Sequence, residues 1–154
     1  MSGLAIRIYG DPVLRQKALP IKNIDRRVRR LAKYMEEAMD KANGVGLAAP
    51  QVGVSERIIV VKVKSPIVLV NPVITYMEGE DLAEEGCLSL PNVVGDVGRA
   101  TRVVVKGLDL NEREIEVEAK NLLARAFQHE IDHLDGILFI DRAVSIRRVE
   151  ESSD

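Results

Sequence analysis

The 154-residue sequence predicts an α+β fold, and three observations lead to this prediction. One amphipathic helical segment occurs early in the chain, and a second occurs late. Most of the sequence between them consists of β-branched runs separated by turn residues. Because helical and strand patterns do not alternate, we expect antiparallel sheets rather than parallel βαβ units. No repeat or shift in composition divides the chain, so residues 1–154 are expected to form a single domain.

The first helix is expected over residues 24–42. Apolar side chains recur there at intervals of three and four positions, which places them on one face of a helix. Asn23 is the expected N-cap, and Gly44 is the expected glycine just past the C-terminal end. Arginines decorate the early turns of this segment. We interpret them as a solvated face, with a nucleic-acid contact as the alternative.

Residues 44–53 read GVGLAAPQVG, and the first six letters match the G-x-G-x-x-A pattern of a dinucleotide-binding turn. That turn requires a strand before its first glycine and a helix after its last small residue. Here a helical segment comes before the glycines, and Pro50 and Gln51 follow them. We therefore interpret the glycines as an extended rim without side chains, along which a substrate backbone can lie.

Strands are expected from residue 57 onward. Residues 57–63 and 66–77 are β-branched runs punctuated by proline. Residues 101–119 alternate apolar and polar side chains on either side of turn chemistry at residues 109–112. This pattern predicts a β-hairpin.

The second helix is expected over residues 122–134. Asn121 is its expected cap, and Gly136 is its expected terminator. After it, residues 137–141 (ILFID) are expected to form a short strand. Residues 147–154 are expected to be a frayed, charged tail.

Charge and cysteine content limit the classes of function. A net charge of −2 and a pI near 5.8 argue against a broad electrostatic grip on nucleic acid. Cys87 is the one cysteine, so no intrachain disulfide can form, which suits a reducing compartment. No signal peptide and no apolar run approaching about 20 residues is evident. We therefore expect a cytoplasmic protein with no membrane contact.

The chain has two histidines, and both occur in one helical hexapeptide, QHEIDH. His129 and His133 are four positions apart, so they project from one face of a helix and can converge on one metal ion. Glu130 between them completes an H-E-x-x-H motif, in which the glutamate serves as general base toward a water on the metal. The alternative is a helix with two hydrogen-bonded surface histidines and an ordinary glutamate.

Cys87 is the best candidate for a third ligand. No third histidine exists, and Glu150 and Glu151 lie in the charged tail. A closed Cys2His2 or Cys3His site would need cysteines that this chain lacks, so an open, catalytic site is the economical interpretation. Two alternatives for Cys87 are an inert buried thiol and a nucleophilic Cys–His pair.

Three motifs together resemble the peptide deformylases. GVGLAAPQVG, EGCLSLP and QHEIDHLDG occur in the order and at the separations found in that family, and the similarity extends over nearly the whole chain. These enzymes remove the N-formyl group from the initiator methionine of new polypeptides and release formate. The resemblance implies an α+β fold with antiparallel sheets packed around a central helix that carries the HExxH motif. It also implies an N-formylmethionyl peptide as substrate.

The resemblance implies a metal centre with defined roles. Cys87, His129 and His133 match the family's metal ligands, and Glu130 matches its general acid/base. Fe(2+) is the family's usual physiological metal, and Zn(2+) or another divalent ion also occupies such sites.

The resemblance further implies how the substrate is held. Gln51 matches a glutamine whose side-chain amide stabilises the developing oxyanion together with the main-chain N–H of Leu88. Val45, Gly46 and Gly86 match positions whose main chain pairs with an extended substrate or lines the methionine pocket.

The sequence departs from the family pattern at two places. Many bacterial members have an arginine at the position of Val94, where it helps to hold the substrate backbone, so this contact is lost here or moved to Arg99 or Arg102. The tail is short beside members whose long C-terminal helix docks on the ribosome, so a transient ribosome contact rests on weaker grounds than the chemistry. Glu85 and Arg99 are a candidate supporting ion pair.

Two further hypotheses stay open at this stage. One is a HExxH peptidase that cleaves internal peptide bonds, and the other is a metal-binding or regulatory protein that has lost catalysis. The missing downstream ligand counts against the first. Intact Gln51, Cys87 and Glu130 count against the second.

Overall fold

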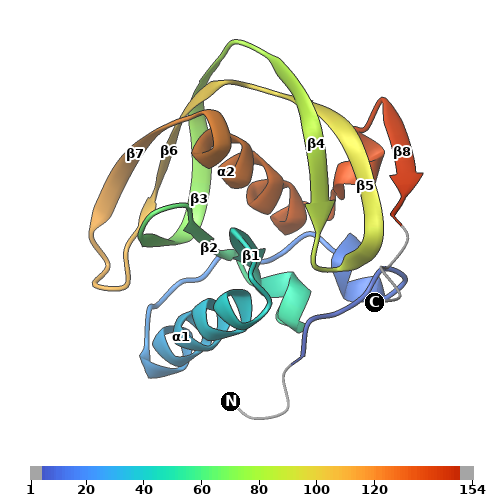
Figure 1. The fold of residues 1–154 in the computed structure, drawn as a ribbon. Coiled ribbons are helices and arrows are strands. Elements are labelled where there is room, and N and C mark those ends of the chain that lie inside the picture. Colours follow the sequence, from blue (N-terminus) through green and yellow to red (C-terminus); the bar gives the residue numbers. More distant parts are fainter. Residues whose placement is uncertain (1–4, 150–154) are drawn as a thin grey trace.

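The computed structural model describes residues 5–149, and it has the α+β architecture that the sequence predicts (Figure 1). The larger sheet has five strands in the order β1-β2-β3-β6-β7, and each neighbouring pair is antiparallel. Its strands are β1 (Gly46–Ala48), β2 (Ile58–Lys62), β3 (Pro66–Glu78), β6 (Arg102–Leu108) and β7 (Glu114–Lys120). The predicted hairpin is therefore confirmed as β6 and β7.

The smaller sheet has three antiparallel strands in the order β4-β5-β8. These are β4 (Asp81–Cys87), β5 (Leu90–Arg99) and β8 (Ser145–Arg148). Helix α2 (Asn121–Leu134), which carries both histidines, runs through the middle of the molecule. Strands β6 and β7 lie on one side of it, and β4 and β5 lie on the other (Figure 1). This arrangement brings the end of β4 against α2.

Helix α1 (Arg26–Lys41) begins two residues later than expected, and Asp25 rather than Asn23 is its N-cap. The Asp25 carboxylate accepts a hydrogen bond of 3.0 Å from the main-chain N–H of Val28. At the other end, Asn43 rather than Gly44 adopts the left-handed conformation, with φ of 57°. Asparagine tolerates this conformation better than most residues, which explains the difference.

Helix α2 begins at Asn121, whose φ of 54° is unusual for a first helical residue, and its N-cap is Lys120. The predicted cap at Asn121 is therefore wrong by one position. The predicted terminator is confirmed, because Gly136 has φ of 73°.

The five-stranded sheet is covered on both faces, which explains the continuous apolar run in β2. Ile59 and Val61 pack with Phe127 of α2, whereas Ile58 and Val60 pack with α1. Both faces of this strand are thus buried, as a strand without an apolar–polar alternation requires. This packing of α2 on the sheet holds His129 and His133, which α2 projects toward β4, in place.

Two predictions for the C-terminal region are wrong. Residues 137–141 contain a 3-10 turn, η3 (Phe139–Asp141), rather than a strand. Residues 147 and 148 of the expected frayed tail belong to β8, which pairs with β5. The tail residues 150–154 lie outside the described residues. None of the helices within residues 5–149 is long and apolar enough to span a membrane.

Candidate metal centre and active site

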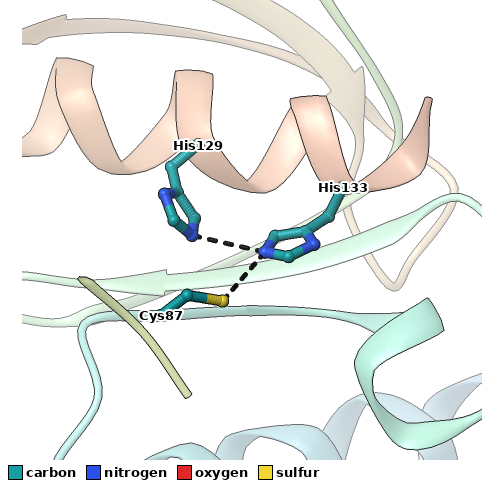
Figure 2. Close-up of side chains that lie close together, drawn as sticks. All are labelled: Cys87, His129 and His133. Atoms are coloured by element: carbon teal, nitrogen blue, oxygen red, sulfur yellow. Dashed lines mark hydrogen bonds between the residues drawn. The ribbon is translucent and has the colours of Figure 1, made fainter. Parts of the chain in front are cut away.

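Cys87, His129 and His133 converge on one point between the two sheets (Figure 2). The histidines project from α2 one turn apart, and Cys87 is the last residue of β4. His133 Nε2 lies 3.3 Å from Cys87 Sγ and 3.3 Å from His129 Nε2. Among the described residues, this is the one group of three or more His, Cys, Asp or Glu side chains whose potential ligand atoms lie within 4.8 Å of one another.

The donor atoms of this group fit a divalent cation. His129 Nδ1 lies 2.9 Å from Glu85 Oε1, and a proton on Nδ1 leaves the Nε2 lone pair directed at the other ligands. Burial lowers the pKa of His133 well below its ordinary value and so favours the neutral ring. Two imidazole nitrogens and one sulfur therefore face one another at close range. Imidazole and thiolate are ligands that zinc and iron accept in proteins.

The pKa of His129 shifts in the opposite direction to that of His133. Burial by itself opposes protonation, but the nearby Glu130 charge and the hydrogen bonds with Cys87 and Glu85 raise the pKa of His129 well above its ordinary value. A proton therefore competes with a metal ion for this site. Metal binding is expected to release protons.

Glu85 is a buried carboxylate shared by three partners. Arg99 donates to both of its oxygens at 2.8 and 3.0 Å, Arg125 donates at 2.6 Å, and His129 is the third partner. Burial alone would raise the pKa of Glu85, but the hydrogen bonds from His129 and Arg99 outweigh it and lower the pKa to about 2. The Glu85–Arg99 pair, a candidate supporting ion pair from the sequence, is confirmed, but the metal ligand that it contacts, His129, was not specified. The alternation of side chains in a strand, which places Glu85 and Cys87 on one face, is the signal that could have shown this link.

The charged network continues away from the metal centre. Arg99 donates to Asp132 at 2.6 Å, and Asp132 in turn accepts two hydrogen bonds from Arg142 at 2.7 and 3.0 Å. Arg99 is therefore buried and fully engaged, while Arg102 pairs with Glu118. Neither arginine lines the pocket beside the metal centre. The contact that Val94 lacks is not supplied by either of them.

Glu130 lies beside the three candidate ligands with 4% of its surface exposed. Its Oε1 atom is buried and has no hydrogen-bond partner among residues 5–149. Burial raises the pKa of Glu130 to about 7. A carboxyl group in this state can accept and return a proton near neutral pH.

Gln51 is held at the opposite wall with its amide group turned toward Cys87. Its Oε1 accepts a hydrogen bond of 2.9 Å from the main-chain N–H of Ala48. Its Nε2 lies 3.2 Å from Ser89 Oγ and 3.4 Å from Cys87 Sγ. The fixed carbonyl end leaves the N–H group directed at Ser89 and Cys87.

A pocket of about 360 Å³ opens beside these residues. Eight of the nine site residues expected from the sequence line it, and the ninth, His133, lies 3.3 Å from Cys87. The pocket's further lining comes from β4 and from α2, where Leu122, Arg125 and Ala126 contribute. The chain segments before β1 and at the end of β4 form two facing walls. The stretch GVGLAAPQVG is thus the wall of a groove, as the sequence indicates, rather than a phosphate-binding turn.

Comparison with known proteins matches residues 4–149 to the family model of polypeptide deformylases. The chain belongs to the polypeptide deformylase family. The peptide deformylase of Halothermothrix orenii is 55% identical over 149 residues, which cover 95% of this chain and 97% of the relative. The crystal structure of peptide deformylase from Thermotoga maritima matches with a TM-score of 0.90 at 41% identity, covering 92% of this chain and 98% of that one.

A third similar protein was solved with a peptide. The class I type b peptide deformylase of Acinetobacter baumannii, in its Met-Ala-Ser-bound crystal structure, matches with a TM-score of 0.87 at 38% identity. The match covers 90% of this chain and 98% of that chain.

Family membership decides among the three hypotheses raised by the sequence. The chain is a peptide deformylase-type hydrolase, which removes the N-formyl group from newly made polypeptides. The Cys87–His129–His133 group and the family together support a bound divalent metal ion.

Proposed function

We propose that this deformylase hydrolyses the formamide bond of formyl-methionine at a metal held by Cys87, His129 and His133, with Glu130 as the proton carrier. The observation that carries the proposal is a buried carboxyl group, whose Oε1 has no hydrogen-bond partner among residues 5–149, beside a cluster of three metal-binding side chains. Neither feature alone distinguishes a hydrolytic site from a structural one. Their combination supports hydrolysis.

The metal supplies Lewis acidity and lowers the pKa of water when it is bound. We propose Fe(2+) as the native ion, with Zn(2+) as the alternative. The stability order favours zinc over iron(II), so the native loading depends on supply rather than on the donor atoms.

Glu130 takes one proton from the attacking water and returns it to the leaving nitrogen. The new bond forms between the water oxygen and the formyl carbon, and the carbon–nitrogen bond then breaks. The products are formate and the free amino group of methionine. Burial raises the pKa of Glu130 above its ordinary value, which suits a carboxyl group that serves as base in the first step and as acid in the second.

Gln51 and Leu88 stabilise the negative charge that develops on the formyl oxygen. The Gln51 amide is fixed by its hydrogen bonds to Ala48 and Ser89, so it needs no reorientation when charge appears. The Leu88 main-chain N–H is the second proposed donor. One such donor contributes roughly 100- to 1,000-fold in kcat.

The substrate is an N-formylmethionyl peptide that lies extended between the two walls of the pocket. Its main chain pairs with Val45 and Gly46 on one side and with Gly86 on the other. The methionine side chain lies along Leu122 and Ala126, which line the pocket on α2. The Met-Ala-Ser peptide bound by the Acinetobacter baumannii relative supports a peptide of this kind in the groove. The transient ribosome contact, the cytoplasmic location and the single-domain organisation stay predictions.

One assay tests the proposed chemistry. Protein prepared without oxygen and analysed for metal should release formate from formyl-Met-Ala-Ser, with little activity on acetyl-Met-Ala-Ser. Replacement of Glu130 by Gln should lower kcat by at least about 100-fold while the metal content stays unchanged. Normal turnover by this variant would contradict the proposed role of Glu130. Activity that follows zinc rather than iron content would favour the alternative metal.

A further inference from the structure

Gly46 lies directly against the Glu130 side chain. A Cβ atom added to Gly46 would stand 2.5 Å from Glu130 Oε2, 2.9 Å from its Cγ and 3.0 Å from its Cδ. Separations below 3.0 Å are essentially absent from real Cβ contacts, so a side chain at this position requires a movement. The contact involves the middle of the glutamate side chain as well as its end.

The main chain at Gly46 does not need a glycine for its own conformation. Its φ is not positive, and it pairs with Val61 in an ordinary antiparallel register. The following residues Leu47 and Ala48 are fully buried, which holds β1 in place. Glycine at this position is therefore explained by the space that Glu130 occupies. By contrast, a Cβ atom at Gly86 would meet Val94 at 3.6 Å, an ordinary contact.

Hydrogen bonding does not fix Oε1 of the Glu130 carboxyl group among residues 5–149. Oε1 is buried without a hydrogen-bond partner among the described residues, so no donor there holds the group. Its position is limited by packing, and the bare Cα of Gly46 forms one surface of that packing. A carboxyl group held by shape has no protein hydrogen bond to break at Oε1 when it exchanges a proton.

We propose that Gly46 is a positioning residue for Glu130, acting through the absence of a side chain. This role is separate from the main-chain pairing with substrate, because alanine would keep the N–H and C=O groups of residue 46. The inference rests on the proposed function of Glu130 for its catalytic consequence. The steric contact itself does not depend on that function.

Kinetics of Gly46→Ala give the first test. The methyl group should displace the Glu130 carboxyl group, so kcat should fall by about 100-fold while KM stays within about threefold. The metal content should equal that of the wild type. A rise in KM with kcat retained would overturn the inference, because it would show that the methyl group only blocks substrate.

Gly98→Ala is the matched control. A Cβ atom there would stand 2.8 Å from Glu80 Oε1, so the same substitution meets the same chemical group. Glu80 is exposed, and its side chain can turn into solvent. We expect kcat within about twofold of the wild type and a Tm shift below about 2 °C. A loss as large as that of Gly46→Ala would overturn the inference, because it would show a general effect of glycine replacement.

A double-mutant cycle separates the steric contact from the chemistry. In metal-loaded protein, Gly46→Ala should lower Tm by about 5 °C, whereas the same change in a Glu130→Ala background should leave Tm unchanged or raise it, because alanine suits a strand better than glycine does. Equal losses in both backgrounds would overturn the inference. If Gly46→Ala fails to fold, folding of the double variant supports the inference, and its failure overturns it. Full activity of Glu130→Ala would overturn the proposed function. The Tm comparison of the double-mutant cycle would still test the steric contact, because it does not depend on activity.

Discussion

Glu85 connects the metal centre to the protein interior through a single carboxylate. It holds the ring of His129 and at the same time joins Arg99 and Arg125. With only one cationic partner the burial of this group would be unfavourable, because removing a charge from water costs several kcal/mol. The hydrogen bonds with His129 and Arg99 outweigh that penalty and lower the pKa of Glu85 to about 2.

The lowered pKa of Glu85 predicts how stability depends on pH. A carboxyl group whose pKa is depressed on folding contributes stability above its unfolded value, near 4.5, and loses it as the pH falls toward 2. A depression of this size corresponds to about 3 kcal/mol. Metal-free wild type should therefore exceed Glu85→Gln in free energy of unfolding by about this amount at pH 7, and the difference should narrow toward pH 2.

Urea unfolding at several pH values measures this difference. Glu116→Gln is a suitable control, because Glu116 is exposed and pairs with Lys106 only at 3.7 Å. Its effect should stay within about 0.5 kcal/mol at every pH. A wild-type advantage over Glu85→Gln that is equal at pH 7 and pH 2 would contradict the prediction.

Residue spacing in the sequence accounts for the centre of the site but not for its surroundings. His129, Glu130 and His133 are predictable because a helix brings positions four apart to one face. Cys87 follows from counting the available ligands. Arg125 and Asp132 were missed, because their partners come from other elements through tertiary packing. A single sequence holds no local signal for such contacts.

At the scale of elements, the sequence predicts both amphipathic helices, α1 and α2, but it assigns the wrong structure to the short apolar segment 137–141. Residues 137–141 read as a strand because a short apolar run does not distinguish between structures. In the structure, Asp141 accepts a hydrogen bond of 2.9 Å from the Leu138 N–H and pairs with Arg15. These contacts stabilise a 3-10 turn. The partner Arg15 is more than 120 residues away in sequence, so local patterns could not reveal it.

The end of α2 is predicted to be sensitive to substitution at Gly136. This glycine has φ of 73°, and an added Cβ atom would stand 2.6 Å from the main-chain oxygen of Arg15. Main chain cannot move away as a side chain can. Gly136→Ala should therefore lower the free energy of unfolding by about 3 kcal/mol, measured by urea titration, through strain at a positive φ and the clash together.

Gly53→Ala isolates the contribution of the clash. Gly53 also has a positive φ, of 84°, but its added Cβ atom would meet the end of the flexible Arg7 side chain. We expect a loss of about 1 kcal/mol, from backbone strain alone. Equal losses at the two glycines would show that the clash with Arg15 contributes nothing.

At the scale of the whole molecule, the three proposed metal ligands connect the two sheets. Cys87 ends a strand of the three-stranded sheet, whereas the two histidines lie on the helix that packs on the five-stranded sheet. A metal ion bound by all three ligands therefore connects the two layers. Ligand binding to the folded state alone stabilises it in proportion to the logarithm of ligand concentration.

Metal addition should accordingly raise the thermal stability of the entire chain. With Zn(2+) at about 100 times its dissociation constant, we expect Tm to rise by about 5–10 °C. Cys87→Ser, which keeps the shape but weakens the ligand, should show a smaller rise. Scanning calorimetry of both proteins, with and without metal, measures the effect. A Tm that does not respond to metal in the wild type would contradict the bridging role.

The unequal burial of β2 and β8 has a consequence for the order in which the site opens. β2, in the five-stranded sheet that packs on α2, is buried on both faces, whereas every residue of β8 is exposed. Regions with little buried apolar surface open locally at a lower free energy than the core does. We therefore expect β8 to open at a lower free energy than β2 does. Because β8 pairs with β5, and β5 pairs with the strand that ends at Cys87, opening that spreads from β8 is expected to separate Cys87 from the two histidines, which share α2.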